Sequence, residues 1–257
     1  MNNKIIFEQP LNERMRNLLR LEHSFDLIAF RSQDKISNWD CRDILKALLE
    51  VYDLLNRSDF KAELIKELER HSSMLTSLQN NPAVDQNRLK KVSSDICELS
   101  VILKDSSYQP GTTLRDDELV TSFRQRTSIP GGTCDFDLPR IHCWLNQATI
   151  KQEQDLKNWS TDIEPIKKAT YLALDMIRNS TNPTKELADA GFYQQAIESN
   201  LLCQLIRIVL PAASRYYPET SGGKHRFTIR FMEETSTKNR PVQTENDVDF
   251  ELHCCYL

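Results

Sequence analysis

Apolar side chains recur at helical spacing through the first half of the chain. Residues 11–31, 41–55, 60–78 and 89–103 each place an apolar side chain every three or four positions, which predicts four amphipathic helices. Ser37 and Asp40 form a capping-box variant before the second helix, while Ser58 and Asp85 suit the N-caps of the third and fourth. Further helices are expected over 116–127 and 149–180, the latter interrupted near Pro165.

The pattern changes after residue 182. Residues 201–210 are rich in β-formers, and residues 224–232 and 248–256 alternate with period two, which predicts strands of an antiparallel sheet. Residues 4–8 are a candidate N-terminal strand that joins this sheet. We therefore predict an α+β fold: an N-terminal helical bundle domain over 9–182, followed by a C-terminal antiparallel β-sheet domain over 183–257 with strand 4–8. The positions of the six glycines agree with this division, because glycine disfavours helices and none lies in the first 110 residues.

The strand at 224–232 separates charge from apolar surface. Lys224, Arg226 and Arg230 share one face with Thr228 and Met232, while His225, Phe227, Ile229 and Phe231 share the other. If the apolar face packs on the core, the basic face points to solvent, with Arg226 and Arg230 ~13 Å apart. An outward row of guanidinium groups suits an acidic peptide or a phosphate.

Charge leaves two alternatives open for this strand. The chain as a whole carries a formal charge of −4, which excludes a protein that is basic overall and coats nucleic acid or anionic membrane. Residues 201–240 nevertheless hold seven Lys or Arg against three acids. Asp249 and Glu251 on the last strand are candidates to neutralise Arg226 and Arg230 as cross-strand ion pairs. A nucleic-acid-binding module that uses strand 224–232 is a second alternative.

Seven scattered cysteines favour reduced thiols over a disulfide framework. A thiol-dependent enzyme is one alternative, with a candidate nucleophile group of Cys134, His142 and Asp137. A zinc site is disfavoured, because the cysteines and histidines, among them Cys254 and Cys255, do not have the spacing of zinc ligands. We therefore predict no catalytic residue, no metal and no cofactor. The N-terminus does not read as a signal peptide, and no stretch is apolar enough to cross a membrane, so a cytoplasmic protein is expected.

Five blocks of the chain resemble the ZapD family, the bacterial Z-ring-associated protein D. In order they are FEQPLNERMR at 7–16, RQRTSIPGG at 124–132, FDLP at 136–139, RFTIRFM at 226–232 and DFELHCC at 249–255. The resemblance implies a non-enzymatic homodimer that binds the C-terminal tail of FtsZ, the tubulin-like division protein, and bundles its filaments at midcell. It implies no nucleic acid, membrane or small-molecule partner.

The resemblance also implies a set of tail-binding residues. By motif position these are Arg226 and Arg230, with Lys224 adjacent and His142 after the FDLP block. The sequence departs from the family pattern at two places. Glu118 stands where the resemblance implies an arginine, and residues 241–247 lack an expected basic residue, so the positive potential is reduced. The apolar stretch at 18–21 is open to two interpretations, a dimer contact or part of the bundle core.

Overall fold

The structure is a computed structural model that describes residues 4–33, 35–56, 59–79, 81–82, 84–197, 202–223, 225–233 and 240–256. The chain divides into two compact units, a helical unit of Asn17–Ala173 and a sheet unit of Met1–Arg16 with Leu174–Leu257. The division falls within the first and last long helices. Each unit is described by itself.

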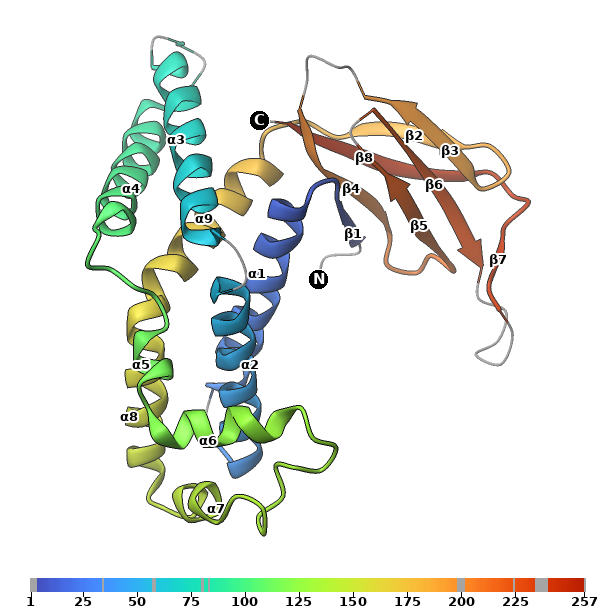
Figure 1. Ribbon diagram of the computed structural model, residues 1–257. Helices are drawn as coiled ribbons and strands as arrows, with labels where there is room; N and C mark the ends of the chain where they lie inside the picture. The colour runs from blue at the N-terminus through green and yellow to red at the C-terminus, as the bar shows by residue number, and fades with distance from the viewer. Residues whose placement is uncertain are drawn as a thin grey trace. The chain divides into compact units, whose positions relative to one another are not determined.

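Helices fill the first unit, as the apolar spacing predicts (Figure 1). α3 and α4 run side by side as an antiparallel hairpin. The short α5 and α7 are helices that the sequence did not predict. The bounds are α1 Glu13–Arg31, α2 Asn38–Asn56, α3 Phe60–Leu78, α4 Gln86–Lys104, α5 Thr112–Arg115, α6 Glu118–Thr127, α7 Pro139–Leu145, α8 Thr149–Ser160, the 3-10 turn η1 Thr161–Ile163 and α9 Glu164–Arg178.

Local capping chemistry explains where several helices begin. The Asp85 carboxylate accepts the backbone N–H groups of Asn87 and Arg88 at the start of α4, as predicted. Ser37 and Asp40 exchange side-chain and backbone hydrogen bonds, which confirms the capping box before α2. Ser58 lies outside the described residues.

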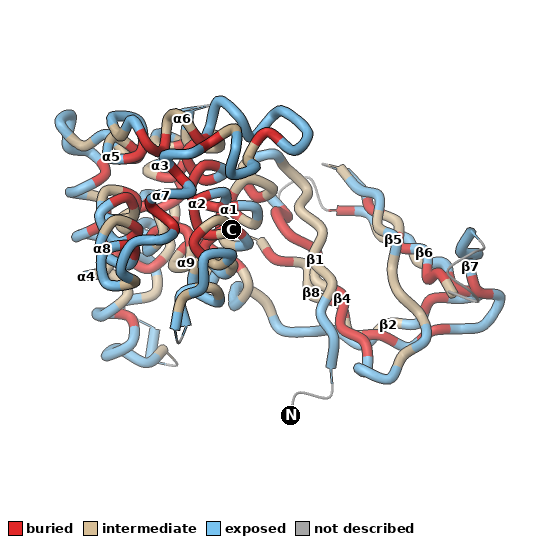
Figure 2. Tube along the Cα trace, turned by 90° about the horizontal axis from the view of Figure 1, so that it is seen from below, coloured by how far each residue is buried: buried red, intermediate tan, exposed pale blue. Residues whose placement is uncertain are grey.

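The apolar stripes of these helices form the core of the helical unit. Figure 2 shows the buried positions lining the inner sides of the helices, and Leu45, Leu48, Leu68 and Phe123 are fully buried. Leu18 and Leu21 on α1 are buried within the chain, at 0% exposure, which supports the core interpretation of these two residues. Among the described residues, no helix combines the length and the apolar character needed to span a bilayer.

The described residues of the second unit form two sheets where the sequence predicted one. The strands are β1 Lys4–Pro10, β2 Thr184–Ala188, β3 Phe192–Ala196, β4 Cys203–Pro211, β5 Tyr216–Gly222, β6 Arg226–Glu233, β7 Val242–Gln243 and β8 Val248–Tyr256. One sheet has the order β1-β4-β8-β2 and the other β3-β6-β5, with β7 added to β6. The described pairs are antiparallel, and the α+β class and the N-terminal strand are confirmed.

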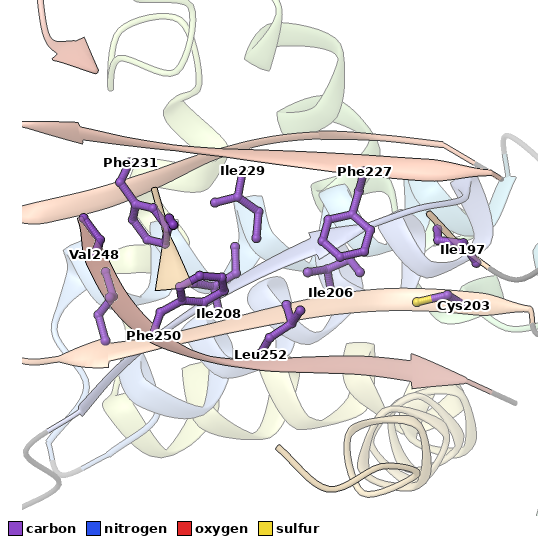
Figure 3. Packing of buried hydrophobic residues seen from close by; sticks show 12 residues of the cluster. Ile197, Cys203, Ile206, Ile208, Phe227, Ile229, Phe231, Val248, Phe250 and Leu252 are labelled. Atoms are coloured by element: carbon purple, nitrogen blue, oxygen red, sulfur yellow. The ribbon is translucent and has the colours of Figure 1, made fainter. Parts of the chain in front are cut away.

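The two sheets share one apolar core. Figure 3 shows Phe227, Ile229 and Phe231 of β6 pointing toward Ile206 and Ile208 of β4 and toward Phe250 and Leu252 of β8. The rings of Phe231 and Phe250 lie 5.0 Å apart between centroids. Because the inner face of β6 packs in this core, its other face points to solvent.

Candidate functional site

Strand β6 presents two arginines on the outer face of its sheet. Arg226 and Arg230 are exposed, while Phe227, Ile229 and Phe231 between and beside them are buried, as the period-two pattern predicts. We call Arg226 and Arg230 the arginine row. The alternation ends before Met232, which was expected to face outward with the arginines but is only 9% exposed. Tyr217 of β5 and Gln243 of β7 lie opposite Met232 on its two sides, so a strand pairs with Met232 on each side.

A tight hairpin positions the start of the arginine row. The N–H of Gly223, directly after β5, donates to the carbonyl of Arg226 at the start of β6 at 3.0 Å. A Cβ on Gly222 would lie 2.9 Å from both Leu11 Cδ2 and Phe227 Cβ, closer than side-chain carbons approach. Glycine at 222 therefore allows the turn to pack against Phe227 while Arg226 faces outward.

The neighbouring strands add polar and apolar groups to the arginine row. On β3, Phe192 lies directly opposite Arg230 and is 40% exposed, and Gln194 lies opposite Thr228. On β5, the exposed Glu219 lies opposite Arg230. Directly opposite residues share a face of the sheet. The outer face thus combines two cations, an amide, an aromatic ring and the carboxylate of Glu219, so its positive charge is concentrated at Arg226.

The ion-pair alternative for the arginine row is wrong. Asp249 and Glu251 lie on β8, in the sheet that does not contain β6, so they cannot pair across strands with Arg226 and Arg230. Glu251 instead accepts hydrogen bonds from Lys4 Nζ at 2.7 and 2.8 Å, and this contact lowers the pKa of Glu251. Within the described part of the chain, no carboxylate lies within 4.0 Å of either guanidinium of the row.

The structure describes only one of the other two expected tail-binding residues, and that residue belongs to the other unit. Lys224 lies outside the described residues. His142 lies on α7 in the helical unit, where its Nδ1 is 3.0 Å from Asp135 Oδ2. It lines a groove of about 550 Å³ with the exposed rings of Trp39 and Phe136. Asp135 also pairs with Arg42, whose guanidinium donates to the carbonyl of Thr133 at 2.7 Å.

The thiol group considered from the sequence is arranged differently from the prediction. The carboxylate beside His142 belongs to Asp135, and Asp137 lies 4.0 Å from Arg126 instead. Cys134 is exposed in the same groove as His142. Over the residues that the structure describes, no group of three or more His, Cys, Asp or Glu side chains is placed to hold a metal ion.

Phe192 and Gln194 are surface residues that sequence reasoning missed, because β3 was not predicted. The signal was the sharp turn before β3, where Ala190 and Gly191 both adopt positive φ, at 46° and 71°. Gly191 lies three residues after the end of β2 and marks the turn, and the segment Phe-Tyr-Gln-Gln-Ala then follows with alternating exposure.

Known proteins similar to this chain share one description. A family model described as "ZapD: Cell division protein" matches residues 19–230. The Cell division protein ZapD of Methylococcus capsulatus is 39% identical over 257 residues, which is 100% of both chains. That of Nitrosomonas eutropha is 40% identical over 98% of this chain and 100% of its own, and that of an Enterobacter species is 36% identical over 99% and 100%.

Proposed function

The chain belongs to the ZapD family of cell division proteins, and from this membership we propose that it binds the C-terminal tail of FtsZ as a homodimer and bundles FtsZ filaments. The proposed site of action is the Z-ring at midcell, in the cytoplasm. The proposed role is that of a crosslinking protein and not of an enzyme, with no cofactor, nucleic acid, membrane or small-molecule partner.

The observation that carries the tail-binding part of this proposal is the exposure of the arginine row. Both arginines are exposed on a strand whose other side packs in the core, and no carboxylate of the described residues lies within 4.0 Å of either guanidinium, although Glu219 lies opposite Arg230 in register. A planar guanidinium binds carboxylates through paired N–H donors. We propose that Arg226, Arg230 and their sequence neighbour Lys224 receive acidic residues of the tail. His142 belongs to the helical unit and is proposed as a separate tail contact.

The arginine row alone supports only modest affinity. An exposed ion pair contributes ~0.2–1 kcal/mol, and ordering a disordered tail opposes binding. The exposed ring of Phe192 opposite Arg230 offers the apolar contact that charge does not supply. Charge then mainly sets orientation and association rate, while apolar burial adds to the lifetime of the complex.

Bundling requires two tail sites on one particle. A two-fold dimer provides them, and linking two weak sites raises the overall avidity by ~10²–10⁴ when both engage at once. We propose the dimer contact for the helical unit. Since Leu18 and Leu21 are buried within one chain, such a contact has to use side chains on the unit's surface.

Titration with a labelled peptide of the cognate FtsZ tail tests the proposal. Replacing one attraction by one repulsion costs about twice an exposed ion pair, ~0.4–2 kcal/mol, which is about 2- to 30-fold in Kd for each arginine. The double variant Arg226→Glu with Arg230→Glu is expected to multiply the two factors. Arg88→Glu, which makes the same charge change at an exposed position on α4, is the matched control and should bind as the wild type does.

Two further outcomes separate this role from its rivals. A double variant that keeps wild-type affinity refutes the arginine row as the binding surface. A gel shift of generic DNA or RNA at moderate salt, abolished by the same variants, would point instead to nucleic acid. Light scattering of FtsZ filaments tests bundling, because a proven monomer that still bundles filaments is incompatible with a bivalent crosslinker.

A further inference from the structure

Strand β1 forms an open edge of its sheet. It pairs with β4 along its whole length, Lys4–Pro10, and it stands at one end of the order β1-β4-β8-β2 (Figure 1). Among the described residues, no strand pairs with its other side. Ile5 and Ile6 on this strand are 43% and 48% exposed, so apolar side chains accompany the open edge. An exposed apolar edge strand is a template for pairing with a further strand.

The hydrogen bonds to β4 show which backbone groups of β1 face the open side. The N–H of Leu11 donates to the carbonyl of Gln204 at 2.9 Å, one step beyond the pair of Pro10 and Leu205. Because hydrogen-bonded pairs alternate along antiparallel strands, the odd-numbered residues of β1 also bond to β4. The even-numbered residues direct their N–H and C=O groups away from β4.

Pro10 agrees with this assignment. It is an even-numbered residue of β1 and has no N–H to donate, so the ladder with β4 loses nothing at this position. Within the described part of the chain, no other backbone group bonds to the N–H or C=O of Lys4, Ile6 or Glu8. The open edge therefore offers donors and acceptors at three alternate residues.

The other long edges of the two sheets carry features that discourage pairing. β5 contains Pro218, which lacks an N–H donor, and β2 and β3 have only five residues each. β1 has a proline only at its end and three apolar residues in a row at 5–7. In the described part of the sheet unit, β1 is therefore the edge best suited to receive another strand.

We propose that β1 pairs with β1 of a second copy of this chain, antiparallel across a two-fold axis, so that the two sheets become one continuous sheet. In such a pair, residues with outward backbone groups lie opposite each other, so even-numbered residues lie opposite even-numbered ones. The register centred on Ile6 places Ile6 opposite the partner's Ile6. Lys4 then lies opposite the partner's Glu8.

This register matches the side chains by their chemistry. Ile6 meets its own copy, and Ile5 lies opposite the partner's Phe7, so apolar side chains meet on both faces. Phe7 packs against the core shared by the two sheets, and the partner's Ile5 extends that core. Lys4 and the partner's Glu8 have opposite charges, so no like charges meet.

The backbone adds hydrogen bonds to this contact. Three hydrogen-bonded residue pairs exchange roughly six N–H to C=O bonds. The side chains of Lys4 and Glu8 keep their partners within the chain, because the new bonds use backbone atoms. Shifting the strands to the next allowed register places Ile6 opposite the partner's Glu8, which loses the apolar match. The register centred on Ile6 is therefore the one expected.

This contact is separate from the dimer contact proposed for the helical unit, because β1 belongs to the sheet unit. A chain that makes both contacts has two partners, so the assembly grows beyond a dimer. The proposal involves only copies of this chain and does not depend on the binding of FtsZ.

Cysteine crosslinking tests the register. Directly opposite residues of a hydrogen-bonded pair lie ~5.5 Å apart between Cα atoms, within the reach of a disulfide, ~4.4–6.8 Å. Ile6→Cys should therefore link two copies under mild oxidation. Ile5→Cys, at similar exposure, is the matched control, because two residues of offset put its Cα ~8 Å from the partner's and prevent the link.

Mass spectrometry of the peptides reads the result. We expect several-fold more linkage between two copies for Ile6→Cys than for Ile5→Cys. The native exposed cysteines Cys97, Cys134 and Cys143 lie in other peptides and are distinguished by mass. Equal linkage of the two variants, or no linkage of Ile6→Cys between copies, overturns the proposal.

Self-association in the absence of FtsZ gives a second measurement. Ile6→Lys places two like charges opposite each other and should lower the average mass measured by sedimentation at a fixed protein concentration. Val101→Lys, at an exposed position on α4, is the control and should keep the wild-type mass. An Ile6→Lys protein with the wild-type mass refutes the contact. If Ile6→Lys fails to fold, the crosslinking decides by itself.

Discussion

Glu8 on β1 joins two arginines from different elements of the sheet unit, and its neutralisation should destabilise the protein strongly. Its Oε1 accepts from Arg178 Nε at 2.9 Å and from Arg207 Nε at 2.8 Å, and its Oε2 accepts from Arg178 Nη2 at 2.6 Å. Arg207 lies directly opposite on β4, while Arg178 ends α9. The substitution Glu8→Gln keeps the shape of the side chain and removes the charge that both guanidinium groups share.

The loss of stability expected for Glu8→Gln follows from the burial of the three side chains. The three side chains are only 16–23% exposed. Removing one partner of a fully buried ion pair lowers the free energy of unfolding by about 3–5 kcal/mol. Because these three side chains keep some exposure to solvent, we expect a loss of ~2–4 kcal/mol for Glu8→Gln. A chain of this size loses roughly 2–4 °C of Tm for each kcal/mol, so Glu8→Gln is expected to melt about 4–16 °C below wild type.

Thermal unfolding followed by circular dichroism measures the effect, with Glu13→Gln as the matched control. Glu13 pairs with Arg16 at the surface, where the two side chains are 64% and 40% exposed, so its neutralisation should cost less than ~1 kcal/mol. Equal melting temperatures for the two variants would refute the reasoning, because burial would then not govern the energy of the Glu8 cluster.

The remaining predictions concern the two sheets. Arg230→Glu places a carboxylate directly opposite Glu219 and should lower the free energy of unfolding by ~0.2–1 kcal/mol. Arg226→Glu faces an alanine on β3 and should leave the free energy of unfolding unchanged. Urea titration measures both, and equal losses would contradict the argument from strand register. Because Lys4 lowers the pKa of Glu251 from 4.5 in the folded state, this pair stabilises the protein above pH 4.5 and its contribution is lost as the pH falls through the folded pKa. Glu251→Gln should therefore flatten the acid limb of a stability-against-pH curve, and an unchanged limb would show that the pair contributes nothing.

Much of the local structure follows from short-range pattern. The helical spacing, the caps at Asp85 and at Ser37 with Asp40, and the strands at 4–8 and 248–256 are confirmed because each depends on neighbours within a few residues. The elements that the sequence did not predict are short and have weak patterns. One example is β3, which is recognised as a strand only from the turn that precedes it.

That strand β6 has a cationic face and an apolar face follows from its residues alone, because side chains alternate along any extended chain. Which carboxylates lie near those cations depends on the tertiary fold. Strand order is set by long-range packing, which a period-two pattern does not encode, and it put Asp249 and Glu251 in the other sheet, with Glu251 bound to Lys4. The same limit applies to α1, where periodicity identifies Leu18 and Leu21 as apolar but only the packed bundle shows that they are buried within the chain.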